Sequence, residues 1–146
     1  MAKTKAKGVH YVDNKKFHQA MIDWKEKCKD AEEAGDELPR ITDYIGSCFL
    51  KIANGLSYRP NFINYTYKQE MISDGIENCL QYLDNFDGEK SNNPFAYYTA
   101  AVTNSFVRII NIEKRNQNIR DDILEMNGMN PSWTRQNADS HPSKPK

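Results

Sequence analysis

The chain of 146 residues has few of the residues that build reactive or cross-linked sites. Its three cysteines, Cys28, Cys48 and Cys79, are odd in number and lack zinc-ligand spacing, so we interpret them as reduced, small apolar residues. The three histidines are scattered, and the sequence has no glycine-rich phosphate loop and no nucleophile beside a base. We therefore expect a protein that is not an enzyme and that uses no cofactor or metal.

Long apolar runs are lacking too. No stretch approaches the ~20 apolar residues that span a bilayer, and no apolar segment of a signal peptide follows the lysine-rich N-terminus. The sequence therefore predicts a soluble, intracellular protein without membrane contact. The 20 basic and 20 acidic residues also leave no net charge. Because proteins that rely on phosphate contacts are usually basic, either the chain does not touch nucleic acid, or its charges are segregated and a larger partner supplies positive surface.

What the sequence does contain is helical periodicity, which predicts an all-α fold of about four main helices in a compact domain. The first helix starts at Asp13 or Asn14 and carries apolar residues three or four apart. Thr42 is a candidate cap for a second helix that ends before Arg59. A third helix spans about 67–83, and Asn93 followed by a proline predicts the start of a long fourth helix.

The ends of the chain differ from this middle part. Residues 1–12 are predicted to form a flexible basic arm and residues 13–126 the helical domain. Residues 127–146 are polar, contain three prolines and lack periodicity, which predicts a disordered tail. We expect one domain, because a chain of this length has room for a single helical core and little more.

The charged residues are not spread evenly. From Lys68 to Lys90 there are six acids and two bases, a net charge of minus four. From Thr103 to Arg120 there are four bases and one acid, a net charge of plus three. These runs are either ordinary solvated helix faces or two contact surfaces, an acidic one for a basic partner protein and a basic one for nucleic acid.

The fourth helix also carries tyrosines in its first turns. A period of 3.6 residues places Tyr97 and Asn104 on one face, away from the apolar stripe that contains Phe95, Tyr98 and Phe106. A tyrosine and an amide on an exposed face are suited to stacking one unpaired base and hydrogen-bonding another. The alternative is that Tyr97 packs on a neighbouring loop.

Several blocks of the sequence resemble region two of bacterial sigma factors, and more closely the late-transcription sigma factors of T-even-type bacteriophages. The run Glu70–Gly75 followed by Asp84–Asp87 resembles the acidic helix and turn of that region. The similarity covers roughly residues 9–115. Four stretches are similar to the phage factors: Tyr11–Lys15, Ile22–Lys25, Lys68–Glu77 and Asn93–Tyr97.

The resemblance implies a sigma factor that binds host bacterial core RNA polymerase and directs it to phage late promoters by melting a minus-ten-type element. The acidic helix would dock on the clamp coiled coil of the largest polymerase subunit, and the next helix would capture the melted non-template strand. The implied polymerase-binding residues are Glu70, Ser73, Asp74 and Glu77. The implied DNA-binding residues are Tyr97, Tyr98, Thr99, Asn104, Arg108, Lys114 and Arg115.

The chain departs from the family in three places. General sigma factors have a tryptophan pair where this chain has Ala100 and Ala101, so Tyr98 is the candidate replacement. No helix-turn-helix follows the fourth helix, and the segment 137–146 has no hydrophobic sliding-clamp epitope. The alternative is a polymerase-binding adaptor or co-activator that does not read DNA. The resemblance places the protein in the cytoplasm of the infected host and allows for a phage co-activator as a further partner.

Overall fold

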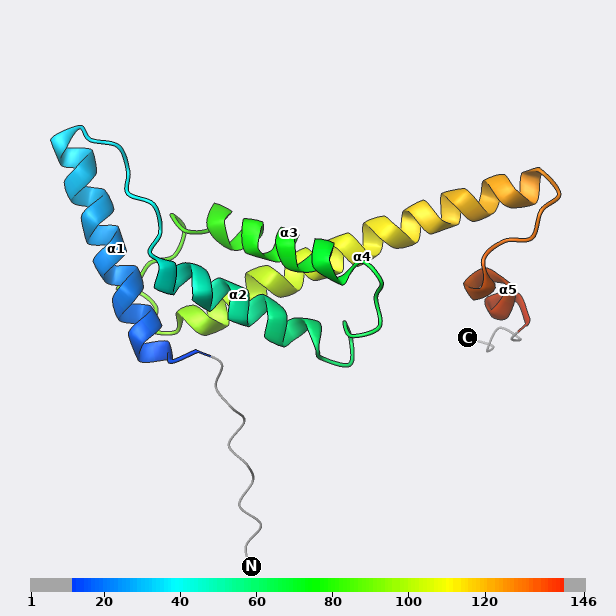
Figure 1. The fold of residues 1–146 in the computed structure, drawn as a ribbon, viewed down its shortest axis with the longest axis horizontal. Coiled ribbons are helices and arrows are strands. Elements are labelled where there is room, and N and C mark those ends of the chain that lie inside the picture. Colours follow the sequence, from blue (N-terminus) through cyan, green and yellow to red (C-terminus); the bar gives the residue numbers. More distant parts are fainter. Residues whose placement is uncertain (1–11, 141–146) are drawn as a thin grey trace, which may run out of the picture. The chain divides into compact units, whose positions relative to one another are not determined.

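The computed structural model describes residues 12–140, with side chains to 137, and this part of the chain is all-α. The helices in chain order are α1 (Asn14–Ala34), α2 (Asp43–Ser57), α3 (Lys68–Gln81), α4 (Pro94–Met126) and α5 (Trp133–Ser140) (Figure 1). No strand is found within the described range. The prediction of an all-α fold is confirmed.

The helix starts follow the expected capping chemistry. The Asp13 carboxylate accepts hydrogen bonds from the backbone N–H groups of Lys15 and Lys16, and the Thr42 hydroxyl accepts one from Ile45. The Asn93 side-chain oxygen accepts one from the N–H of Ala96, directly before the proline that opens α4. The helix α1 ends where Gly35 adopts a left-handed conformation, with φ of 72°.

The chain divides into two compact units, one up to Phe106 and one from Val107 onward. The first unit holds α1, α2, α3 and the first part of α4. Its core is an aromatic cluster in which the Tyr98 ring centroid lies 4.7 Å from that of Phe49, 5.7 Å from Phe17 and 5.8 Å from Phe86. Val12, the last residue of the predicted flexible arm, is buried, and residues 1–11 lie outside the described range.

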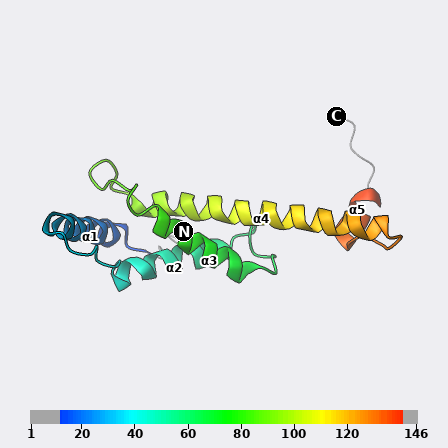
Figure 2. The same cartoon turned by 90° about the horizontal axis from the view of Figure 1, so that it is seen from above.

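The helices α3 and α4 lie side by side in the first unit (Figures 1 and 2). Gly75 permits this close approach, because a Cβ atom there would lie 3.1 Å from Val102 and 3.1 Å from Phe106. The Asn78 amide donates a hydrogen bond of 2.8 Å to the carbonyl oxygen of Ala101, which ties α3 to α4. The two helices that carry the predicted contact residues are therefore held in a defined register.

The second unit contains the distal part of α4 and the helix α5, which the sequence placed in a disordered tail. The nearly buried Asp121 carboxylate accepts hydrogen bonds of 2.7 Å from both the N–H and the hydroxyl of Ser132. Arg135 on α5 donates to Asp122 at 2.7 Å and to the carbonyl oxygen of Asn118 at 3.3 Å. These polar contacts explain why residues 133–140 form a helix without an apolar stripe.

Candidate functional site

The predicted polymerase-binding residues lie on α3, and the structure separates them into two groups. Glu70, Ser73 and Glu77 are exposed, and within the described residues no ion pair involves them. Asp74 is half-buried and accepts a hydrogen bond from the hydroxyl of Ser105 on α4. Asp74 therefore differs from the other three predicted residues, because its carboxylate lies in the contact between α3 and α4.

Tyr97 is half-buried at the start of α4, among other aromatic rings. Its ring centroid lies 5.3 Å from that of Phe86 and 6.5 Å from that of Tyr82, with Tyr82 in an edge-on arrangement. Burial, and to a lesser degree the neighbouring Tyr82, raises the pKa of Tyr97 above its ordinary value of 10.0. The ring is therefore held in place and its hydroxyl stays neutral and able to donate. Tyr82 is 40% exposed, and it joins this cluster although the sequence analysis did not single it out.

Tyr98 and the hydroxyl of Thr99 are buried, whereas residues that contact a DNA strand are expected to be exposed. The Tyr98 side chain is fully buried in the aromatic core, so its ring cannot stack on a base in this conformation. The Thr99 hydroxyl is also covered, and neither hydroxyl has a hydrogen-bond partner among the described residues. Asn104 is exposed. The first unit thus offers Tyr97 and Asn104, but not Tyr98, to a ligand.

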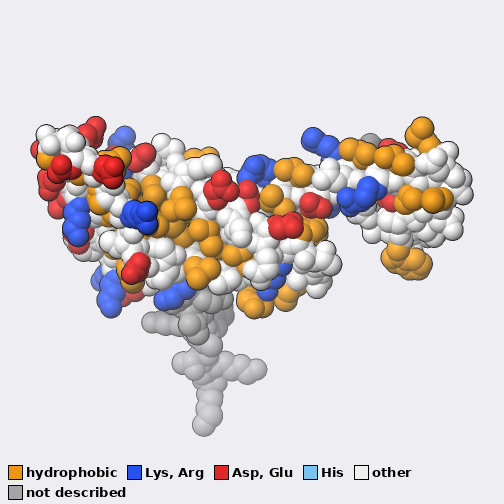
Figure 3. Space-filling view, turned by 45° about the horizontal axis from the view of Figure 1, so that its top comes forward, with side chains coloured by type: hydrophobic (Ala, Val, Ile, Leu, Met, Phe, Trp, Pro, Cys, Tyr) orange, Lys and Arg blue, Asp and Glu red, His pale blue; other side chains and the backbone are white. Residues whose placement is uncertain are grey.

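The remaining predicted DNA contacts belong to the second unit. Arg108, Lys114 and Arg115 are all exposed on α4. Figure 3 shows apolar side chains on the surface of this unit. Its exposed large apolar residues include Ile119, Ile123, Met126, Met129 and Trp133. Asp121 lies under α5, and the hydrogen bonds from Ser132 lower the pKa of its carboxyl below the ordinary 3.8.

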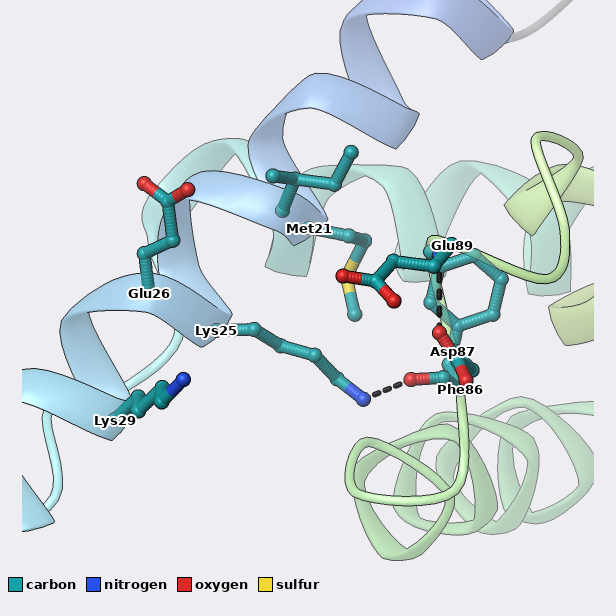
Figure 4. A pocket seen from close by; sticks show the side chains of 9 residues that line it. Met21, Lys25, Glu26, Lys29, Phe86, Asp87 and Glu89 are labelled. Atoms are coloured by element: carbon teal, nitrogen blue, oxygen red, sulfur yellow. Dashed lines mark hydrogen bonds between the residues drawn. The ribbon is translucent and has the colours of Figure 1, made fainter.

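The turn between α3 and α4 is fastened to α1, and this positions Tyr97. The Lys25 ammonium donates to the carbonyl oxygen of Phe86 (Figure 4) and, at 3.4 Å, to that of Asp84. His18 Nε2 lies 2.9 Å from the Gly88 carbonyl oxygen, so this nitrogen carries the proton and donates it. Because the Phe86 ring packs on Tyr97, these hydrogen bonds also hold the Tyr97 ring in position.

A pocket of about 290 Å³ lies between α1 and this turn (Figure 4). Its walls carry both signs of charge, and no histidine, serine or cysteine lines it. The lining residues are Met21, Ile22, Lys25, Glu26, Lys29, Phe86, Asp87, Gly88 and Glu89. The pocket is therefore lined by two lysines and three carboxylates beside apolar side chains.

The described residues form neither a metal-binding cluster nor a membrane-spanning helix. Among the described residues, no group of three or more histidine, cysteine, aspartate or glutamate side chains is arranged to hold a metal ion. Over the same range, none of the helices combines the length and apolar character needed to cross a bilayer. Comparison of the chain with models of protein families and with curated protein sequences finds no match.

Proposed function

We propose that this chain is a sigma factor that binds host bacterial core RNA polymerase and helps to open phage late promoters. The observation that carries the proposal is the packing of two helices in the first unit. The helix α3 exposes Glu70, Ser73 and Glu77, and it is held by Asn78 against the helix that presents Tyr97. One compact unit thus combines an acidic surface for a basic protein with an aromatic ring for an unpaired base.

The acidic surface is suited to a partner with basic or hydrogen-bond-donating groups. Both Glu70 and Glu77 are exposed, and the serine between them can donate or accept. Asp74 is left out of this surface, because its bond with Ser105 stabilises the α3–α4 contact. A test of polymerase binding must therefore change Glu70 and Glu77 and keep Asp74.

The variant Glu70→Lys, Glu77→Lys tests the acidic surface. We expect at least about a tenfold loss of affinity for core RNA polymerase, because charge reversal makes like charges face each other and a tenfold change needs only about 1.4 kcal/mol. The matched control is Glu32→Lys, Glu33→Lys, which makes the same charge change on the exposed end of α1. Biolayer interferometry with immobilised core enzyme measures both; equal affinities for the two double variants would place the docking surface elsewhere.

The ring of Tyr97 is the element proposed to capture a base. Stacking on an aromatic ring is worth about 1–3 kcal/mol per base, which offsets much of the few kcal/mol needed to extrude one. We expect Tyr97→Ala to reduce promoter opening on duplex DNA, and the loss to shrink on a template already unpaired at the minus-ten-like segment. Tyr97→Phe keeps the ring and should retain most of the activity. The control is Tyr44→Ala, a tyrosine that is 36% exposed on α2.

Permanganate reactivity of unpaired thymines, in the presence of core polymerase, measures the opening. If Tyr97→Ala and the unmodified protein give equal reactivity on duplex DNA, α4 is not the melting element.

That result would favour the second candidate, a polymerase-binding adaptor that does not read DNA. The specific observation in favour of an adaptor is the placement of Tyr98 and of the Thr99 hydroxyl, which leaves fewer exposed groups for a strand than the sequence predicted.

A further inference from the structure

The segment formed by α2 and its connection to α3 has a composition unlike the rest of the chain. Residues 44–69 contain no aspartate or glutamate, although the whole chain has 20 of them. The same stretch contains three basic residues and four tyrosines. Most of its aromatic and basic side chains gather at the end, in residues 58–68, which we call the tyrosine loop. Along the chain, the first carboxylate after this loop is that of Glu70, in the first turn of α3.

The tyrosine loop is held by contacts within the first unit. Phe62 is buried, and its ring packs edge-on against Phe106 with centroids 5.3 Å apart. The carbonyl oxygen of Arg59 accepts hydrogen bonds from the N–H groups of Phe62, at 2.8 Å, and Ile63, at 3.0 Å. A loop anchored in this way binds a ligand without first losing conformational freedom.

The loop brings rings and cations together, with Tyr58 and Arg59 exposed and the other two tyrosines and Lys68 half-buried. Tyr58 is 63% exposed, and the Lys68 ammonium lies 3.6 Å from the centroid of its ring. The Tyr65 and Tyr67 rings lie 5.2 Å apart, tilted by 35°. Arg59 is exposed next to Tyr58 in the chain. Lysine and arginine hold phosphates, and tyrosine rings stack on bases of any sequence.

We infer that the tyrosine loop binds a short single strand of nucleic acid, with a base stacked on Tyr58 and phosphates held by Arg59 and Lys68. A pair of Tyr58 and Lys68 alone would be explained as a surface cation–π contact. That explanation does not account for the exposed arginine, the adjacent rings of Tyr65 and Tyr67 or the stretch free of carboxylates. This inference goes beyond the proposed function, since it requires neither polymerase nor the Tyr97 ring of α4.

The binding test uses the full chain without polymerase and a fluorescein-labelled oligodeoxythymidine of about ten nucleotides, a length within the usual site size. Fluorescence anisotropy should show binding that weakens as salt rises. Tyr58→Ala should weaken it by about tenfold, a loss within the range for one stacked base, and Tyr58→Phe should keep it. Lys68→Ala should weaken binding and reduce its dependence on salt.

Two controls match these changes elsewhere in the chain. Trp133→Ala removes an aromatic ring that is 74% exposed, and Lys27→Ala removes an exposed lysine from α1. Both should bind the oligonucleotide like the unmodified protein. Oligouridine RNA of the same length should bind within about threefold, because stacking uses the base faces that both strands share. Binding of RNA alone would overturn the stacking basis, as would wild-type affinity in Tyr58→Ala.

A polyanion without bases separates this inference from binding to an acidic protein. Polyglutamate should displace the oligonucleotide much less well than unlabelled oligodeoxythymidine, and equal displacement would overturn the inference. Photocrosslinking with a 4-thiothymidine oligonucleotide then locates the site by mass spectrometry of the linked peptide. Crosslinks within residues 58–68 support the inference. Crosslinks on α4 alone would overturn it and leave the proposed function standing, whereas failure to bind core polymerase would affect only the proposed function.

Discussion

The hydroxyl of Tyr98 allows a sharp test of the aromatic core. The side chain is fully buried, with four rings around it, and its hydroxyl has no hydrogen-bond partner among the described residues. A buried hydroxyl without a partner costs about 1–3 kcal/mol. Tyr98→Phe removes this cost and keeps the ring. We therefore expect the variant to be more stable by about 1 kcal/mol, which raises Tm by about 4–8 °C for a domain of this size.

The same position should be very sensitive to loss of the ring. Tyr98→Ala empties a site among packed aromatic side chains and should cost about 3–5 kcal/mol, a large part of the 5–15 kcal/mol that typically separates folded from unfolded domains. Urea unfolding followed by circular dichroism measures both variants. A Tyr98→Phe variant less stable than the unmodified protein by 1 kcal/mol or more would show that the hydroxyl has a partner. Reduced promoter opening at unchanged stability would instead return Tyr98 to the DNA-binding residues.

Three further predictions follow from the packing and the titrating groups. Gly75→Val should destabilise the protein by about 1–3 kcal/mol, since even a Cβ atom would meet Val102 and Phe106 at 3.1 Å. Gly46→Ala should stabilise it by about 0.5–1 kcal/mol, because the nearest neighbour of the added Cβ atom lies at 3.7 Å. Thermal unfolding compares the stability of the two variants. The pKa of Asp121 is lowered in the folded protein, so its contribution to the docking of α5 is complete above the ordinary pKa of 3.8 and is lost as pH falls through the lowered pKa. The fluorescence of Trp133, measured in a Trp24→Phe background, should change as this contribution is lost. A fluorescence signal that stays unchanged down to about pH 2 would contradict the prediction. Burial raises the pKa of Cys79 to about 12, so iodoacetamide at pH 8 should label the half-buried Cys28 first and reach Cys79 only after unfolding, as measured by peptide mass spectrometry.

The starts of the helices were predictable because capping is local. Asp13, Thr42 and Asn93 each satisfy backbone N–H groups two or three residues away, so the residues that decide these starts stand next to each other in the sequence. The helix α5 was not predictable in this way. Its contacts join Ser132 and Arg135 to acids on α4 that stand 11 to 13 residues earlier. Spacing alone did not reveal that pairing.

In the candidate site too, features set by neighbouring residues were predictable from the sequence, and features set by distant residues were not. Periodicity placed Tyr98 in the apolar stripe of the fourth helix, and the structure agrees with that placement; the suggestion that Tyr98 replaces a missing tryptophan came only from the resemblance. The acids of α3 look alike in sequence, because each is separated from the next by three or four residues. Only the position of Ser105 across the helix contact distinguishes Asp74 from Glu70 and Glu77.

The zero net charge of the chain conceals a basic segment and an acidic segment that are neighbours in the first unit. The tyrosine loop is basic and ends at Lys68, and the acidic surface of α3 begins at Glu70. The sign of the surface charge therefore reverses within a single helical turn. At distances larger than their separation the opposite fields largely cancel, and salt screens the remainder over a Debye length of about 10 Å at 0.1 M. Neither surface therefore attracts partners from far away. A nucleic-acid strand and a basic protein would each be selected at contact, by stacking on Tyr58 and by pairing with Glu70 and Glu77. Binding at either surface should consequently depend more on dissociation rates than on association rates.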